Sequence, residues 1–137
     1  MDIRQNLYAA LCERLKEVES VKHVDLWNHN VEFLDAEDAW QRPAVFVEFC
    51  QIAWQSMAGG KYRGEGEIRL HIVTDWNDGG QGTAWELCED IRRAVDQMPG
   101  EQFSIVHLTT TETNHNHEDI LESIDTYRVR YYMAIGK

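Results

Sequence analysis

The sequence has few prolines and cysteines, and it contains no long apolar run. Two prolines and 43% hydrophobic residues in 137 positions are typical of a globular domain and exclude a disordered or fibrous chain. The three cysteines (Cys12, Cys50 and Cys88) include no C-x-x-C pair, so we expect reduced thiols buried among apolar residues. No stretch reaches the roughly 18 apolar residues that span a bilayer, and the first residues lack a signal-peptide pattern. We therefore expect one domain over residues 1–137 that folds in a cytoplasm and does not enter a membrane.

Positive charge is also scarce. The chain has 13 Lys and Arg against 24 Asp and Glu, which gives a formal net charge of -11. Such a charge repels phosphate backbones and anionic lipid head groups at long range, so tight nucleic-acid binding is not expected. A solvated surface that favours solubility explains most of these carboxylates, including the local concentration D-A-E-D at 35–38.

Catalytic motifs are absent from the sequence. It contains no G-x-S-x-G, H-E-x-x-H, P-loop or G-x-G-x-x-G pattern. The glycine-containing segments at 64–66 and 78–82 are too short and too acidic in context to cradle a phosphate, and they predict turns. We therefore expect no catalytic residue and no cofactor, and we expect that the protein is not an enzyme.

One segment, T-N-H-N-H-E-D-I at 113–120, raises the question of a metal site. His115 and His117 lie two residues apart beside two carboxylates. Zinc requires three or four ordered ligands, and a further one could come from a neighbouring side chain: Glu118, Asp119 or His107. The asparagines within the segment favour a turn, which would splay the two histidines apart. We expect a loop without metal, and a small metal-binding enzyme that uses His115 and His117 stays an alternative.

Two segments have the apolar spacing of amphipathic helices. The first has apolar residues at every third or fourth position: Ile3, Leu7, Leu11, Leu15 and Val18. For the second, T-A-W-E predicts a capping box in which Thr83 is the N-cap and Glu86 reaches back. Its apolar stripe continues to Met98, and Pro99 and Gly100 are expected to end it.

The remaining segments predict strands. We expect them at 21–27, 44–54, 62–76, 103–111 and 124–135, with a long loop from Asn28 to Arg42. In the third, Ile68, Leu70 and Ile72 alternate with polar residues, which places His71 on an exposed face.

The strands at 44–54 and 62–76 predict a hairpin joined by Q-S-M-A-G-G-K. Its strands are expected to be unusually long, and its glycine-rich tip, with Gly59, Gly60, Gly64 and Gly66, is expected to project beyond the core. The order of elements predicts an α+β fold: two helices packed on one face of a mostly antiparallel sheet, with a long β-hairpin.

Five tryptophans exceed what one core of this size usually needs: Trp27, Trp40, Trp54, Trp76 and Trp85. Three of them lie at the ends of predicted elements or in a loop, and tryptophan is enriched at protein interfaces. Burial in the core is an equally good explanation for Trp27 and Trp85, and a weaker one for the other three.

The chain resembles a known family over nearly its full length. The resemblance is carried by the order of elements and by V-D-L-W-N-H-N-V-E-F, R-P-A-V-F-V-E-F, the glycine-tipped hairpin, T-A-W-E-L-C-E-D-I-R-R-A-V and the terminal Y-R-V-R-Y-Y-M. Together these are similar to the tail terminator or tail completion (minor tail) proteins of tailed phages, of the prophage type. The family is not enzymatic, so no catalytic residue is carried over.

The resemblance implies a structural protein that assembles in the cytoplasm of a bacterial host and resides in the virion tail. Its subunits would form a ring, typically a hexamer, that caps the tail tube and joins it to the head connector. A head-tail connector or a tail tube subunit of the same particle remains an alternative. Ring interfaces in the family involve a sheet edge and a projecting hairpin, which corresponds here to residues 44–76. From this and the tryptophans, we expect the following interface residues: Trp40, Trp54, Gly59, Gly60, Tyr62 and Trp76.

Overall fold

The computed structural model describes residues 2–28, 40–75, 81–114 and 120–135. Within these ranges, two helices and five strands follow one another: α1 (Ile3–Leu15), β1 (His23–Leu26), β2 (Ala44–Met57), β3 (Lys61–Asp75), α2 (Gln81–Val95), β4 (Phe103–Asn114) and β5 (Ile120–Ala134). Neither of the helices within these ranges is long and apolar enough to cross a membrane.

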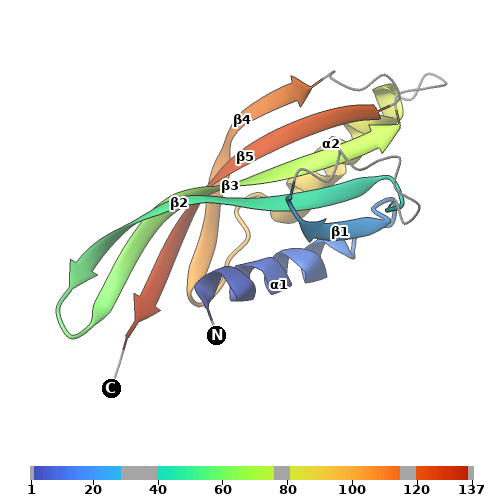
Figure 1. Cartoon of the computed structure of the whole chain (residues 1–137). Helices are drawn as coiled ribbons and strands as arrows, with labels where there is room; N and C mark the ends of the chain where they lie inside the picture. Colours follow the sequence, from blue (N-terminus) through green and yellow to red (C-terminus); the bar gives the residue numbers. More distant parts are fainter. Residues whose placement is uncertain (1, 29–39, 76–80, 115–119, 136–137) are drawn as a thin grey trace.

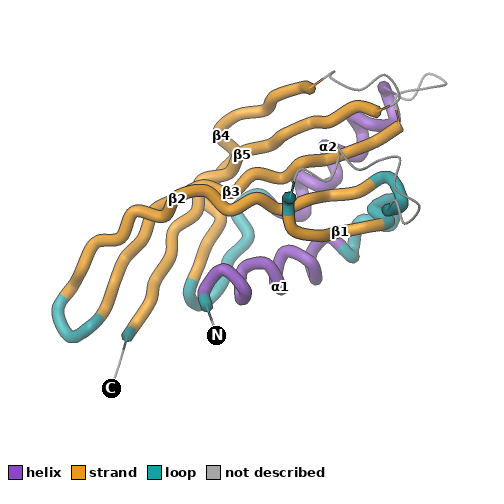
Figure 2. The backbone as a smooth tube through the Cα atoms, in the orientation of Figure 1, coloured by secondary structure: helices purple, strands orange, loops and turns teal. Residues whose placement is uncertain are grey.

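All five strands belong to one twisted sheet with the order β1-β2-β3-β5-β4 (Figures 1 and 2). The β1 strand runs parallel to β2, and every other neighbouring pair is antiparallel. The central β3 and β5 pair along their full lengths, from Lys61 opposite Ala134 to Asp75 opposite Ile120. The expected α+β class, with two helices and a mostly antiparallel sheet, is confirmed.

The main core lies between the helices and one face of the sheet. Leu7, Leu11 and Leu15 have no exposed surface, and they share one hydrophobic cluster with Ile91 and Val95 of α2. The sheet contributes alternate residues of its strands to this cluster: Val45, Val47, Ile68, Leu70, Ile72, Tyr127, Val129 and Tyr131. Burial of these side chains fixes which face of each strand points toward the helices.

A smaller cluster lies on the other face of the sheet. Ala44, Phe46 and Val73 are fully buried there, and Trp27 and Trp40 pack against them. This face is therefore covered near β1, although neither helix contributes to the cluster.

The connection between β2 and β3 is shorter than the sequence predicted. We expected residues 55–61 to be a loop, but β2 continues to Met57 and β3 begins at Lys61. Gly64 and Gly66, which were assigned to the tip, lie inside β3. A Cβ atom on Gly64 would come within 2.7 Å of the Trp54 ring, so glycine provides space for an aromatic side chain from the neighbouring strand.

Several predicted boundaries of the helices were also wrong. The second helix begins at Gln81, so Thr83 lies inside it and is not the N-cap. It ends at Val95, before the predicted Pro99, and Gln97 follows with a φ of 60°. A left-handed residue interrupts the helical hydrogen bonding, which ends the helix while Met98 still reaches the core. The first helix ends at Leu15, and Val18 packs against the core from the following turn.

The terminal strand pair was predicted correctly, and both strands are longer than expected. β4 reaches Asn114, and β5 starts at Ile120. Residues 115–119, which include His115 and His117, lie outside the described residues, as do 29–39 of the predicted long loop and Trp76.

Candidate interaction surfaces

Four of the six predicted interface residues meet at one end of the sheet. Trp54 pairs with Gly64, Tyr62 pairs with Ser56, and Gly59 and Gly60 form the turn between β2 and β3. Trp40 lies instead near the opposite end of β2, against Phe46. We call the end of the sheet that contains the β2–β3 turn the distal end.

Exposed apolar side chains concentrate at the distal end. The exposed fractions are 38% for Trp54, 39% for Met57, 43% for Tyr132 and 63% for Ile135. Trp54 packs over Gly64, with its ring centroid 6.0 Å from that of Tyr131, so its position is fixed. Large apolar side chains that are exposed yet held in place are typical of protein interfaces.

The β2–β3 turn is held by the end of β5. Gly59 and Gly60 have φ angles of 76° and 73°, in the region that favours glycine. The Ile135 amide donates to the Gly60 carbonyl at 2.8 Å, and a Cβ on Gly60 would lie 2.7 Å from the Ile135 oxygen. The tip is therefore part of a three-stranded extension, which corrects the expected two-stranded projecting arm.

The distal half of β2 is an edge strand. The β1 strand pairs only with Ala44 to Val47, and no described strand lies against the outer side of residues 50–57. Residues 53–57 are all exposed. Unpaired backbone amides and carbonyls along such an edge can accept a strand from another chain.

Trp40 packs within its own subunit. Its ring lies 4.8 Å from that of Phe46 and 6.4 Å from that of His23, and the Arg42 guanidinium lies 5.8 Å above it. Arg42 is held in turn by Asp75 at 2.6 Å. This partly buried tryptophan therefore connects β1, β2 and the end of β3.

His71 is buried, although the sequence predicted an exposed position. Its side chain is 6% exposed and stacks on Trp27, with 3.7 Å between ring centroids. Nδ1 lies 2.7 Å from Glu122, and Nε2 lies 2.7 Å from Glu48. Both ring nitrogens therefore lie at hydrogen-bond distance from a carboxylate. The alternation of residues along β3 was interpreted correctly, but the second face of the sheet is also covered here.

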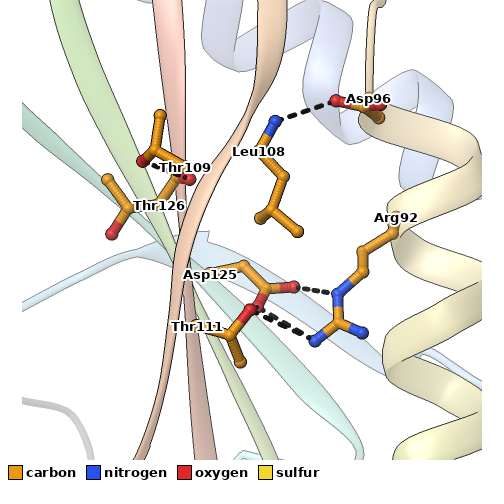
Figure 3. A network of polar contacts seen from close by, with 7 residues as sticks. All are labelled: Arg92, Asp96, Leu108, Thr109, Thr111, Asp125 and Thr126. Carbon is orange, nitrogen blue, oxygen red and sulfur yellow. Dashed lines mark hydrogen bonds and ion pairs between the residues drawn. The ribbon is translucent and has the colours of Figure 1, made fainter.

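A second buried polar group attaches α2 to the sheet (Figure 3). Asp125 is fully buried, and Arg92 donates to its two oxygens at 2.9 and 3.2 Å. The Thr111 hydroxyl donates to the same carboxylate at 2.7 Å. The hydrogen bond with Asp125 raises the pKa of Arg92 above its already high ordinary value. This network stabilises the arrangement of the helix against β4 and β5, and sequence spacing gave no indication of it.

No group of three or more histidine, cysteine or acidic side chains is arranged for a metal ion within the described ranges. His115 and His117 are outside those ranges, so the expectation of a loop without metal remains a prediction. The described cysteines are free; Cys88 is buried, whereas Cys12 and Cys50 are only half-buried, in contrast to the expectation. Burial raises the pKa of Cys88 above its usual range, which disfavours the reactive thiolate.

Comparison with known proteins gives a likeness of fold only. No protein-family model matches the chain, and no curated protein matches it. Among solved structures, it is similar to a chain of a particle described as "Virion of native gene transfer agent (GTA) particle", with a TM-score of 0.62 and 14% sequence identity. The match covers 93% of this chain and 95% of that chain.

Proposed function

We propose that this protein is a structural component of a phage-like particle and that it serves as the tail terminator. The observation that carries the proposal is the correspondence of fold, nearly from end to end, with a chain of a gene transfer agent virion. It agrees with the resemblance of the sequence to tail terminator and tail completion proteins. The similarity extends over 93% of this chain and 95% of the virion chain.

In the proposed role, copies of the chain form a ring, hexameric as in the family that the sequence resembles. The distal end has the features that such an assembly requires. It combines an unpaired strand edge at residues 50–57 with the exposed Trp54 and Ile135. An isolated subunit with this edge would be prone to non-specific pairing, and a closed ring removes that exposure.

The ring caps the tail tube, stops its growth and joins it to the head connector. The net charge of -11 suits a ring through which DNA passes, because carboxylates repel the phosphate backbone. The protein acts at these contacts in the host cytoplasm during assembly and remains in the virion tail.

The experiment that tests the role is a deletion of the gene in its own particle-producing strain, followed by electron microscopy of the products. Loss of a terminator should yield tails of irregular length that are separate from filled heads, and the protein expressed in trans should restore uniform joined tails.

The same deletion distinguishes the other roles in the particle. Absence of every tube would identify a tail tube subunit, and tails of normal length beside separate heads would identify a connector. Intact, infectious particles would contradict all three structural roles. In that case metal analysis of the purified protein would test the small metal-binding enzyme that uses His115 and His117.

A further inference from the structure

Five of the 13 lysine and arginine residues lie together on one face of the sheet. Lys61, Arg63 and Arg69 alternate along β3, and Arg128 and Arg130 alternate along β5. The register pairs Arg128 with Glu67 and Arg130 with Glu65, so all five cations point to the same side of the sheet. All five are exposed, and this side is opposite the helices. We call the segment of this side that runs from Lys61 to Arg69 in β3, with Arg128 and Arg130 beside it in β5, the basic face.

The charge of the basic face differs in sign from that of the remaining chain. Three carboxylates accompany the five cations in this segment, namely Glu48, Glu65 and Glu67, which leaves two net positive charges, whereas Asp75, Glu112 and Glu122 lie farther along the same side of the sheet. The rest of the chain then has 21 carboxylates and 8 cations, or a net charge of -13. The basic face is therefore a local region of positive charge on a chain whose remaining charge is strongly negative.

The cations are partly held in place by their neighbours. Arg128 binds Glu65 at 2.6 Å, and Arg130 lies 3.9 Å from the same carboxylate. The Arg63 guanidinium lies 5.9 Å from the centre of the Tyr132 ring. Within the described part of the chain, neither Arg63 nor Lys61 has a carboxylate at ion-pair distance, so both are available to an external anion.

A complementary acidic surface lies at the other end of the molecule. Glu17 and Glu19, just after α1, line the same shallow hollow as Asp90 of α2, and Glu86 lines the adjacent hollow. One cation, Arg93, also lines it, and its guanidinium is paired with Glu89 and Asp90. Beside Glu86, Trp85 is 61% exposed, and an exposed indole is a good partner for a guanidinium. We call Glu17, Glu19, Trp85, Glu86 and Asp90 the acidic surface.

The two surfaces cannot meet within one subunit. The β2–β3 turn lies at one end of the molecule, whereas α1 ends and α2 begins at the opposite end (Figure 1). A contact between them therefore requires two copies.

We propose that the basic face of one subunit binds the acidic surface of a second copy of this chain, in a head-to-tail contact. Because the two surfaces differ, each bound pair of subunits leaves one basic face and one acidic surface unoccupied, so the contact repeats and closes into a ring when the rotation between subunits permits. The closure into a ring rests on the proposed function; the pairwise contact does not. Arg63, Lys61 and Trp85 are the residues on which the contact depends.

Two double variants test the contact by sedimentation velocity. Lys61→Glu with Arg63→Glu reverses the basic face, and Glu17→Lys with Glu86→Lys reverses part of the acidic surface. Each variant should fail to self-associate, with an association constant roughly 100-fold or more below that of wild type, because like charges then oppose each other. An equimolar mixture should associate again, because each variant retains one intact surface and the two reversed surfaces are opposite in charge.

A matched control makes the same change of charge away from both surfaces. Arg4→Glu, at the start of α1, makes the chain as acidic as the single variant Arg63→Glu does; Arg4→Glu should associate like wild type, whereas Arg63→Glu should associate more weakly. Circular dichroism should report a native fold for all of these variants, because the substituted side chains are exposed. Wild-type association should weaken on going from 0.1 M to 1 M salt, where the screening length falls from about 10 Å to about 3 Å.

Association of the basic-face variant at wild-type strength would overturn the proposal. So would a wild-type protein that stays monomeric yet binds duplex DNA through the same arginines, because the occupant of the basic face would then be a phosphate backbone. Failure of the proposed contact can be distinguished from failure of the proposed terminator role. Rings that cap tails but tolerate the substitutions would disprove only the contact, whereas a charge-dependent oligomer that never caps a tail would disprove only the terminator role.

Discussion

At the scale of single residues, two buried tyrosines of β5 have polar atoms without a partner. The hydroxyls of Tyr127 and Tyr131 form no hydrogen bond within the described part of the chain, and both side chains are fully buried. A buried hydroxyl without a partner costs about 1–3 kcal/mol of desolvation. These rings therefore stabilise the core through apolar contacts while their hydroxyls oppose folding.

We expect Tyr127→Phe to leave stability unchanged or to raise it by about 1 kcal/mol at neutral pH. Burial raises the pKa of Tyr127 well above its usual range. The neutral ring thus contributes stability that is present below the unfolded-state pKa of about 10 and is lost as pH rises above it, by at most about 1.4 kcal/mol per pH unit. Urea unfolding at pH 8 and pH 11 should show a smaller loss for the variant than for wild type. Tyr132→Phe, at an exposed position, should match wild type at both pH values.

The buried Asp125 provides a second test. Replacing Arg92 by Met removes its cationic partner and leaves a carboxylate with no exposed surface, and we expect a loss of about 3 kcal/mol in unfolding free energy. The neighbouring Arg93→Met removes ion pairs in which Arg93 is 70% exposed, so its effect should stay below about 0.5 kcal/mol. Equal losses from the two substitutions in chemical denaturation would show that the buried Arg92–Asp125 pair contributes no more to the free energy of unfolding than the exposed ion pairs of Arg93.

At the scale of secondary-structure elements, glycines in α2 and β3 have opposite roles. Gly82 has open space where a Cβ would be placed, whereas a Cβ on Gly64 would lie 2.7 Å from the Trp54 ring. The same chemical change, Gly→Ala, should therefore have opposite signs at the two sites.

We expect Gly82→Ala to be neutral or to stabilise the protein by up to about 1 kcal/mol through helix propensity. Gly64→Ala should cost about 1–3 kcal/mol, because Trp54 must move or the strands must separate. Thermal unfolding by circular dichroism measures both. If Gly64→Ala is harmless, the additional variant Trp54→Ala/Gly64→Ala should tell whether the indole occupies that space in solution.

At the scale of the whole molecule, metal dependence is the property that separates a structural protein from the enzyme alternative. The double variant His115→Ala/His117→Ala should keep the wild-type melting temperature within about 2 °C, and EDTA should leave the wild type unchanged. A structural metal contributes folding free energy directly, so a drop of many degrees on chelation would contradict the expectation. Elemental analysis of the purified protein provides the independent measurement.

Much of the fold could be predicted because its signals are local. Spacings of three and four in α1, and alternation in β3 and β5, depend on neighbours within a few positions of the chain. The expectation that Trp54, Gly59, Gly60 and Tyr62 lie together also followed from one predicted strand pair. Errors appeared where a boundary depended on distant partners, as when the ring of Trp54 required Gly64 to lie inside a strand and not in a turn.

The order of elements, the α+β class and the net charge of -11 are properties of the amino-acid order alone, because short-range periodicity and composition encode them. Folding was needed to create three other features: the buried His71 between Glu48 and Glu122, the anchor of Arg92 on Asp125, and the basic face of β3 and β5. The partners of His71 lie 23 and 51 positions away in the chain, and Asp125 lies 33 positions from Arg92. Such contacts depend on strand register, which is a property of the assembled sheet and is set by burial of its two faces.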